Sequence, residues 1–149
     1  SEIELQGATV YRVNGLIDDC GKIVGEGKAK VGWFDTSTLK EPYRIEGKKT
    51  MGLELAEQLG WEIPDRCVVP IASGSLYTKI AKGFQEFIDV GLLDGDVPTM
   101  NGAQPEGCNP VASAFAAGQD FCKPVRPKTI AKSLAIGNPA DGGDRAPVD

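Results

Sequence analysis

Residues 68–80 read Val68-Val69-Pro70-Ile71-Ala72-Ser73-Gly74-Ser75-Leu76-Tyr77-Thr78-Lys79-Ile80. A β-branched stretch gives way here to an amphipathic one through four small residues, which predicts a strand, a tight loop and a helix. Small residues let the backbone approach an anion, and the N–H groups and dipole at a helix N-terminus favour negative charge. The stretch therefore indicates a phosphate-binding loop. An ordinary connection with Ser73 or Ser75 as helix N-cap is the alternative.

Strand and helix patterns alternate along the rest of the chain. Strands are expected at 8–13, 31–35, 67–71 and 98–103, and helices at 16–28, 50–60, 76–90 and 110–117, with a weaker one at 129–135. The strand at 67–71 is apolar on both faces, as in the middle of a parallel sheet. The alternation predicts an α/β fold with a three-layer parallel sheet flanked by helices. Such sheets bind ligands at the carboxyl ends of their strands, where the loop after Ile71 should lie.

Composition limits the class of protein. A chain of 149 residues with 41% hydrophobic and 25% charged residues is typical of one soluble globular domain. Its net charge of -5 argues against nonspecific nucleic-acid binding, which requires clustered Lys and Arg. No apolar run reaches membrane-spanning length, and the acidic start Ser1-Glu2-Ile3-Glu4 does not resemble a secretory signal. We therefore expect a cytoplasmic protein with neither a nucleic-acid nor a membrane partner.

The residue types available restrict the chemistry. The chain has no His, which excludes Ser-His-Asp and Cys-His nucleophile systems and zinc sites that contain His. Its cysteines are Cys20, Cys67, Cys108 and Cys122, and no two of them form a C-x-x-C pair. No metal site is therefore expected, and Cys67 is interpreted as a small buried hydrophobic residue.

A long block after the first quarter of the chain carries a family resemblance. Residues 37–61, Ser-Thr-Leu-Lys-Glu-Pro-Tyr-Arg-Ile-Glu-Gly-Lys-Lys-Thr-Met-Gly-Leu-Glu-Leu-Ala-Glu-Gln-Leu-Gly-Trp, resemble the central signature of threonine synthase, a pyridoxal-phosphate enzyme of fold type II. The loop beginning at Pro70, the segment 104–108 and the ending Ile136-Gly137-Asn138-Pro139 follow in the order and spacing of that family. The resemblance covers nearly the whole chain.

The resemblance implies a partial fold type II domain, a cofactor and a reaction. The cofactor is pyridoxal phosphate, and the reaction converts O-phosphohomoserine and water to threonine and phosphate. The implied protein is a lyase of threonine biosynthesis, and its partner is a small phosphorylated amino acid. The full-length enzyme could form a homodimer. Residues 1–45 would belong to a smaller N-terminal-type subdomain and 46–140 to the cofactor-phosphate-binding α/β domain. A disordered tail is expected over 141–149.

The resemblance also assigns binding residues. Those that match the family's cofactor-phosphate loop are Ala72, Ser73, Gly74, Ser75 and Leu76. Ala72 replaces a glycine of the family pattern, and it would be strained if the position requires a positive φ.

Three further residues match the family's substrate site. Arg44 corresponds to an arginine directed at the substrate phosphate, and a guanidinium fork suits that dianion. An ion pair of Arg44 with Glu41 or Glu46 is the alternative. Ser37 and Thr38 lie near polar residues that face the substrate in the family, although hydroxyls in a turn commonly serve the turn itself.

Two residues near the expected rim of the sheet are weaker candidates. Glu106 could approach the cofactor ring, with a solvated or helix-capping carboxylate as the alternative. Asn138 could line the site or serve only as a turn residue.

No catalytic residue is assigned within the chain. In the family, the lysine that forms the Schiff base with the cofactor lies upstream of the segment matched here, and the hydroxyl residue that meets the pyridine nitrogen lies downstream. The chain is thus expected to be a central fragment without turnover of its own. Lys48 and Lys49 precede a predicted helix among polar neighbours, so we expect them on a solvated face.

Two other functions are compatible with these patterns. The chain could be a noncatalytic domain that binds phosphorylated ligands, or a fragment of a related fold type II dehydratase or sulfhydrylase. The block Pro-Tyr-Arg-Ile-Glu-Gly-Lys-Lys-Thr, residues 42–50, favours threonine synthase over these relatives.

Overall fold

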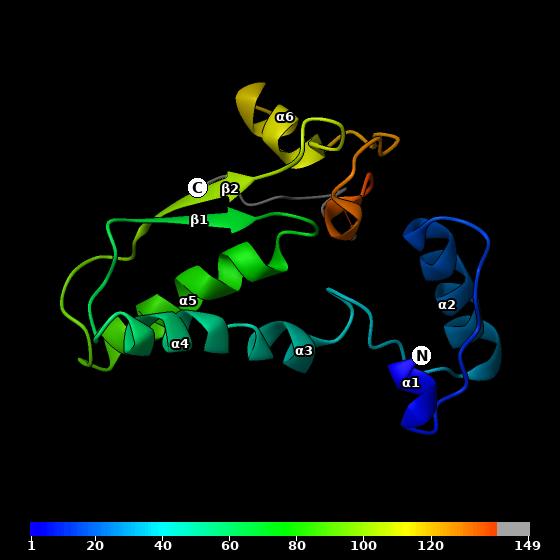
Figure 1. Cartoon of the computed structure of the whole chain (residues 1–149), viewed down its shortest axis with the longest axis horizontal. Helices are drawn as coiled ribbons and strands as arrows, with labels where there is room; N and C mark the ends of the chain where they lie inside the picture. The colour runs from blue at the N-terminus through cyan, green and yellow to red at the C-terminus, as the bar shows by residue number, and fades with distance from the viewer. Residues whose placement is uncertain (140–149) are drawn as a thin grey trace. The chain divides into compact units, whose positions relative to one another are not determined.

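The computed structural model describes residues 1–139. In chain order its elements are α1 (Glu2–Leu5), α2 (Ile17–Val31), α3 (Pro42–Gly47), α4 (Thr50–Gln58), β1 (Arg66–Pro70), α5 (Ser75–Asp89), β2 (Thr99–Ala103), α6 (Pro110–Ala116) and the 3-10 helix η1 (Lys132–Leu134) (Figure 1). The chain divides into two compact units, one of residues 1–35 and one beginning at Thr36. The tail expected over 141–149 lies outside the described residues.

The first unit is helical, and both strands expected in it are wrong. Residues 8–13 form no regular element, and Val31 is the last residue of α2. Gly32 adopts a φ of 74° and turns the chain back after the helix. The Trp33 ring then packs on α2 so closely that a Cβ on Gly27 would lie 1.9 Å from a ring atom. The apolar run at 31–35 therefore covers a helix face and pairs with no strand.

The second unit contains a parallel sheet, as predicted. β1 and β2 pair in register from Arg66 opposite Thr99 to Pro70 opposite Ala103. Because the strands are parallel, the loops that follow them leave from the same edge of the sheet. The loop after β1 leads into α5, and the loop after β2 leads into α6. Figure 1 shows α4 and α5 on one side of the two strands and α6 on the other.

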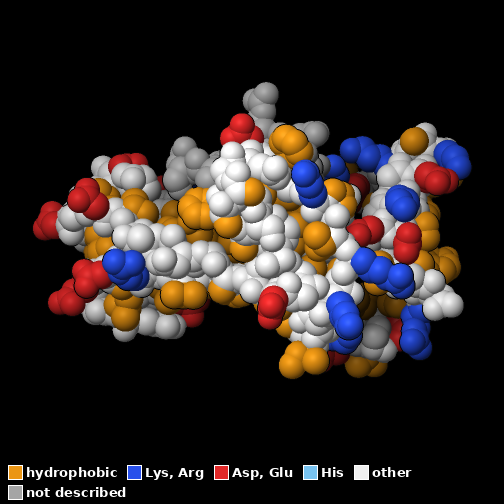
Figure 2. Space-filling view, turned by 90° about the horizontal axis from the view of Figure 1, so that it is seen from above, with side chains coloured by type: hydrophobic (Ala, Val, Ile, Leu, Met, Phe, Trp, Pro, Cys, Tyr) orange, Lys and Arg blue, Asp and Glu red, His pale blue; other side chains and the backbone are white. Residues whose placement is uncertain are grey.

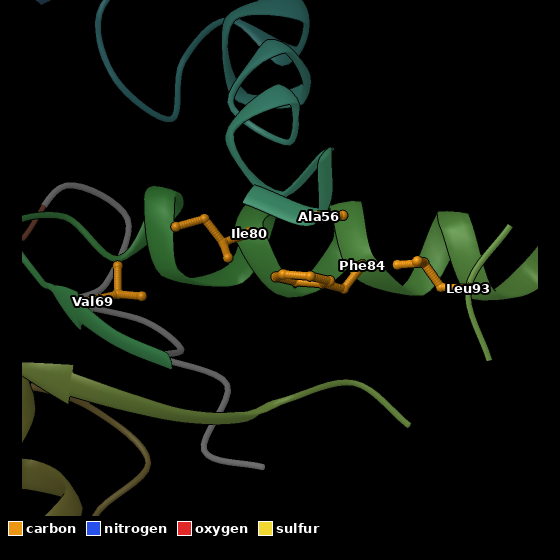
Figure 3. Close-up of a cluster of buried hydrophobic side chains, with 5 residues drawn as sticks. All are labelled: Ala56, Val69, Ile80, Phe84 and Leu93. Carbon is orange, nitrogen blue, oxygen red and sulfur yellow. The ribbon is translucent and has the colours of Figure 1, made fainter. Parts of the chain in front are cut away.

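The core of this unit lies where α5 packs on α4 and the sheet. Its buried members are Ala56, Val69, Ile80, Phe84 and Leu93 (Figure 3). The Phe84 side chain is fully buried. The apolar spacing that predicted α5 marks the face that this helix buries, through Ile80 and Phe84. Helix α4 instead buries Gly52 and Ala56, and its apolar Met51 and Leu59 are 44% and 47% exposed.

Close approach of α4 to α5 depends on glycines. A Cβ on Gly52 would lie 2.5 Å from the Ile80 carbonyl oxygen, and one on Gly83 would lie 2.5 Å from the Lys49 carbonyl oxygen. Both contacts would be with backbone atoms, which cannot rotate away. The crossing therefore fixes where α5 begins relative to the end of α3.

Strand β1 differs from the expectation in its burial. Val69 is buried at 4% exposure and faces the core, whereas Val68 on the opposite face is 73% exposed. The strand is therefore not buried on both faces within the described residues. Figure 2, seen from the side that carries α6, shows further hydrophobic side chains open to solvent.

Some elements were not predicted, and others end differently. Glu41 caps α3 by accepting a hydrogen bond from the Arg44 N–H, and Pro42 occupies the first turn, a combination that starts helices. Gly60, with a φ of 77°, follows α4 as expected of a helix-ending glycine. The weak helix expected at 129–135 is reduced to the short η1.

In the part of the chain described, no helix combines the length and apolar character needed to cross a membrane.

Candidate phosphate-binding site

The loop at 71–74 lies at the carboxyl edge of the sheet. Ile71 extends β1 by donating its N–H to the Ala103 carbonyl over 2.8 Å. The Gln104 side chain, just after β2, donates to the Ile71 carbonyl over 3.3 Å. These bonds hold the start of the loop against the neighbouring strand, so the next residues emerge at the rim where parallel sheets bind ligands.

Gly74 makes the turn from the loop into α5. It is the N-cap residue and has a φ of 84° and a ψ of -22°, a conformation that side chains disfavour. Ala72 is not among the residues with positive φ, so its methyl group is accommodated without that strain. The loop position that requires a positive φ is therefore Gly74, and the alanine in place of glycine at position 72 does not strain the backbone.

The N-terminus of α5 receives no side-chain cap from residues 1–139. Gly74 is the N-cap residue of this 15-residue helix, so the predicted alternative of Ser73 or Ser75 as an N-cap is wrong. The first N–H groups of a helix have no intrahelical partner, and the helix dipole adds partial positive charge there. The backbone thus presents donors at the same place as the two serine hydroxyls.

Ser75 is the buried polar centre of the loop, with only 3% of the residue exposed. Its Oγ accepts a hydrogen bond from Lys48 Nζ over 2.6 Å and lies 3.4 Å from Ser73 Oγ. Because Lys48 donates to Ser75, the hydroxyl proton of Ser75 is left to donate in another direction.

Lys48 reaches the loop from the C-terminal end of α3. It is half-buried, so the expected solvated face is wrong for this residue. Burial lowers the pKa of the Lys48 ammonium, and the nearby charge of Arg44 lowers that pKa further. Within residues 1–139, no carboxylate oxygen lies within 4.0 Å of either cation.

Arg44 is held by the backbone of the preceding turn. Its Nη1 donates to the Thr36 carbonyl over 2.8 Å, and its N–H donates to the Glu41 carboxylate. The guanidinium makes no ion pair with Glu41 or Glu46 among the described residues, so that alternative is wrong. Ser37 and Thr38 lie in the turn after Thr36. The structure thus joins Arg44 to the predicted substrate turn, and the substrate role stays a prediction.

Lys49, unlike Lys48, belongs to an ion network. Glu46 pairs with Lys49, Lys79 and Lys82 at distances between 2.6 and 3.0 Å, and Lys49 also pairs with Glu86. Hydrogen bonds from Lys79, Lys82 and Lys49 hold the pKa of Glu46 well below its usual range. This network fastens α3 and the start of α4 to α5, and so supports the position of Lys48.

The two weaker candidates are both exposed. Glu106 lies in the turn between β2 and α6, at the same sheet edge as the Ser73 loop, with its side chain solvated. Asn138 lies in a bend near the end of the described residues. No hydrogen bond within residues 1–139 joins either side chain to the loop. A role for either residue in the site stays a prediction.

The donor set suits a phosphate dianion. It combines two hydroxyls, one ammonium and the N–H groups of a helix N-terminus, all of which are common phosphate donors. Nothing in residues 1–139 gathers three metal-ligating side chains. Burial raises the pKa values of the Cys67 and Cys122 thiols, which makes them poor nucleophiles. Sequence reasoning missed Lys48 because its approach to Ser75 depends on α3, which was not predicted.

Comparisons with known proteins show what the chain is similar to. The sequence pattern of the family described as "Pyridoxal-phosphate dependent enzyme" matches residues 1–146. A threonine synthase of Methanocaldococcus jannaschii is 37% identical over 137 residues, which are 91% of this chain and 33% of that protein. One of Methanosarcina acetivorans is 36% identical over 138 residues, 92% of this chain and 34% of that protein. The chain thus spans about a third of the length of these curated relatives.

Solved structures show the same fold. A maize serine racemase superimposes with a TM-score of 0.61 at 26% identity, covering 79% of this chain and 34% of the racemase. A T.th. threonine deaminase superimposes with a TM-score of 0.66 at 20% identity, covering 88% of this chain and 41% of the deaminase. Both are fold type II enzymes, which confirms the predicted fold class.

Proposed function

Because the chain belongs to the pyridoxal-phosphate dependent enzyme family, we propose that it is the cofactor-phosphate-binding segment of a threonine synthase. The proposed parent reaction takes O-phosphohomoserine and water to threonine and phosphate. Bound pyridoxal phosphate supplies an electron sink for such chemistry. This chain supplies binding and orientation, and we propose that it has no turnover alone, since the resemblance assigns none of its lysines to the cofactor aldehyde.

One observation carries the assignment of the cofactor site. Ser73, Gly74 and Ser75 place two hydroxyls and an uncapped helix N-terminus together at the carboxyl edge of a parallel sheet. Ser75 is buried, so a phosphate bound there is shielded from bulk water, which strengthens each hydrogen bond. Ala72 and Leu76 flank these donors, and we propose that they line the same loop.

The substrate phosphate is assigned to a second position. We propose that Arg44 binds it, with the hydroxyls of Ser37 and Thr38 beside it. The Arg44 guanidinium lacks a carboxylate partner among the described residues and is fixed at the Thr36 carbonyl. A guanidinium in this state retains donors for a phosphate. The curated relatives are named threonine synthases, which favours O-phosphohomoserine over the substrate of a dehydratase. The threonine deaminase structure, at 20% identity, shows the fold alone.

The test of the cofactor site uses pyridoxine 5′-phosphate, which lacks the aldehyde and cannot react with lysines. Calorimetry of the whole chain should show binding of this compound and much weaker binding of pyridoxine. A chain with both Ser73→Ala and Ser75→Ala should lose most of that preference, because each hydrogen bond to a charged group contributes about 1.5–3 kcal/mol.

The matched control is Ser113→Ala, which removes an exposed hydroxyl from α6. This variant should bind as the unaltered chain does. Equal binding of both vitamers by the unaltered chain would contradict the proposed function.

A further inference from the structure

Lys48 stands out because no carboxylate of the described residues neutralises its charge. Its ammonium lies at a buried serine hydroxyl and shares the end of α3 with Arg44, one helical turn away. The other lysines near the start of α5 are matched by Glu46 or Glu86. Lys48 has no such partner within residues 1–139. A half-buried cation beside a second cation is unfavourable unless an anion joins them.

The position of Lys48 specifies where that anion would bind. Nζ lies 2.6 Å from Ser75 Oγ, which itself lies 3.4 Å from Ser73 Oγ. An ammonium has three N–H donors, and Ser75 accepts one of them. The remaining donors are therefore within reach of a group that sits on the two serines.

We infer that Lys48 is an additional ligand of the cofactor phosphate, its ammonium pairing with the dianion held by Ser73, Ser75 and the N-terminus of α5. This inference rests on the proposed function. A phosphate group carries a charge of about -1.5 to -2 at neutral pH, enough to balance both Lys48 and the partial charge of the helix. Partial burial of Lys48 strengthens such a pair, because water screens it less than it screens a fully exposed pair.

Lys48 and Arg44 contact different parts of the site. Arg44 is tied to the Thr36 carbonyl and extends to the substrate turn, whereas Lys48 is tied to Ser75 and extends to the cofactor loop. The two cations one turn apart on α3 would then serve two different phosphates. A neutral residue at 48 should weaken cofactor binding while leaving the substrate side intact.

The experiment compares Lys48→Gln with the unaltered chain by calorimetry against pyridoxine 5′-phosphate and pyridoxine. We expect the Kd for the phosphorylated vitamer to rise about tenfold or more, the loss of one charge-assisted hydrogen bond, with binding of pyridoxine unchanged. Lys48→Arg keeps the charge and should bind the phosphate more tightly than Lys48→Gln does. The control Lys123→Gln makes the same charge change at an exposed lysine and should alter the Kd less than about twofold.

Thermal unfolding separates a ligand role from a structural one. Without ligand, Lys48→Gln should unfold at nearly the temperature of the unaltered chain, but pyridoxine 5′-phosphate should stabilise it less. If the unaltered chain prefers the phosphorylated vitamer and Lys48→Gln binds it equally well, the inference is wrong and the proposed function stands. If the unaltered chain shows no preference, both are wrong.

Discussion

At the scale of the residue, the loop shows which family features this sequence needs. The glycine replaced by Ala72 was a potential source of strain, yet the positive φ falls on Gly74. The replacement is therefore tolerated because position 72 does not adopt a positive φ. Lys48 was expected on a solvated face, whereas its ammonium donates to the hydroxyl of the buried Ser75.

Glu46 gives a residue-scale prediction about pH. Its pKa in the folded protein lies below the ordinary value of 4.5, so the unfolded chain binds the proton more readily. Ionised Glu46 therefore contributes stability that is fully present above about pH 4.5 and is lost as the pH falls through the lowered pKa. Urea unfolding of Glu46→Gln should show a deficit at pH 7 that shrinks below pH 4.5.

The control for this prediction is Glu57→Gln, which changes an exposed carboxylate on α4 that forms no ion pair within the described residues. Its stability should follow that of the unaltered chain at every pH. High salt should reduce the Glu46→Gln deficit, because the network is partly exposed to solvent. A deficit that grows on acidification would contradict the assignment.

At the scale of the element, the crossing of α4 and α5 positions the site. The glycines at 52 and 83 let the two backbones approach, and this approach places the end of α3 beside the start of α5. Amphipathic spacing predicted both helices and the buried face of α5, whereas α4 buries Gly52 and Ala56 and exposes Met51 and Leu59. It did not predict that their contact would bring Lys48 to Ser75, which depends on three-dimensional packing.

Gly83→Ala tests the crossing. In an open helix this change would stabilise by about 1 kcal/mol, since Gly is a poor helix former. Here the new Cβ would lie 2.5 Å from the Lys49 carbonyl oxygen and 3.1 Å from the Gly52 Cα, so the helices must separate. We expect a net loss of about 1–3 kcal/mol in the free energy of unfolding, measured by urea denaturation.

Gly47→Ala provides the matched control in the same unit. Apart from its chain neighbours and its own helix backbone, no atom of the described residues lies within 4 Å of the Cβ position at Gly47, the last residue of α3. This variant should be as stable as the unaltered chain or slightly more stable. Equal stability of Gly83→Ala and Gly47→Ala would show that the crossing is not tight.

At the scale of the whole molecule, the sequence predicted the second unit better than the first. Strands β1 and β2 and helices α4, α5 and α6 follow clear periodicities with capping or turn residues at their ends. The apolar runs at 8–13 and 31–35 were wrongly predicted as strands, because such runs can also pack on a helix, as Trp33 does on α2. Pairing and burial are tertiary properties, so local pattern alone could not distinguish these outcomes.

Long-range contacts also limit what sequence can say about the site. The small-residue loop and the family block predicted the phosphate position from contiguous residues. Ser75 and Lys48 are separated by 27 positions, and their contact requires the fold. The exposure of Val68 could not be predicted for the same reason, because strand periodicity predicts which residues share a face but not what covers that face.

A crystal structure of the chain with pyridoxine 5′-phosphate would show directly where the phosphate group binds. We expect the phosphate at the N-terminus of α5, within hydrogen-bond distance of the Ser73 and Ser75 hydroxyls and of Lys48 Nζ. A phosphate bound elsewhere, with Lys48 still donating to an unliganded Ser75, would contradict this expectation.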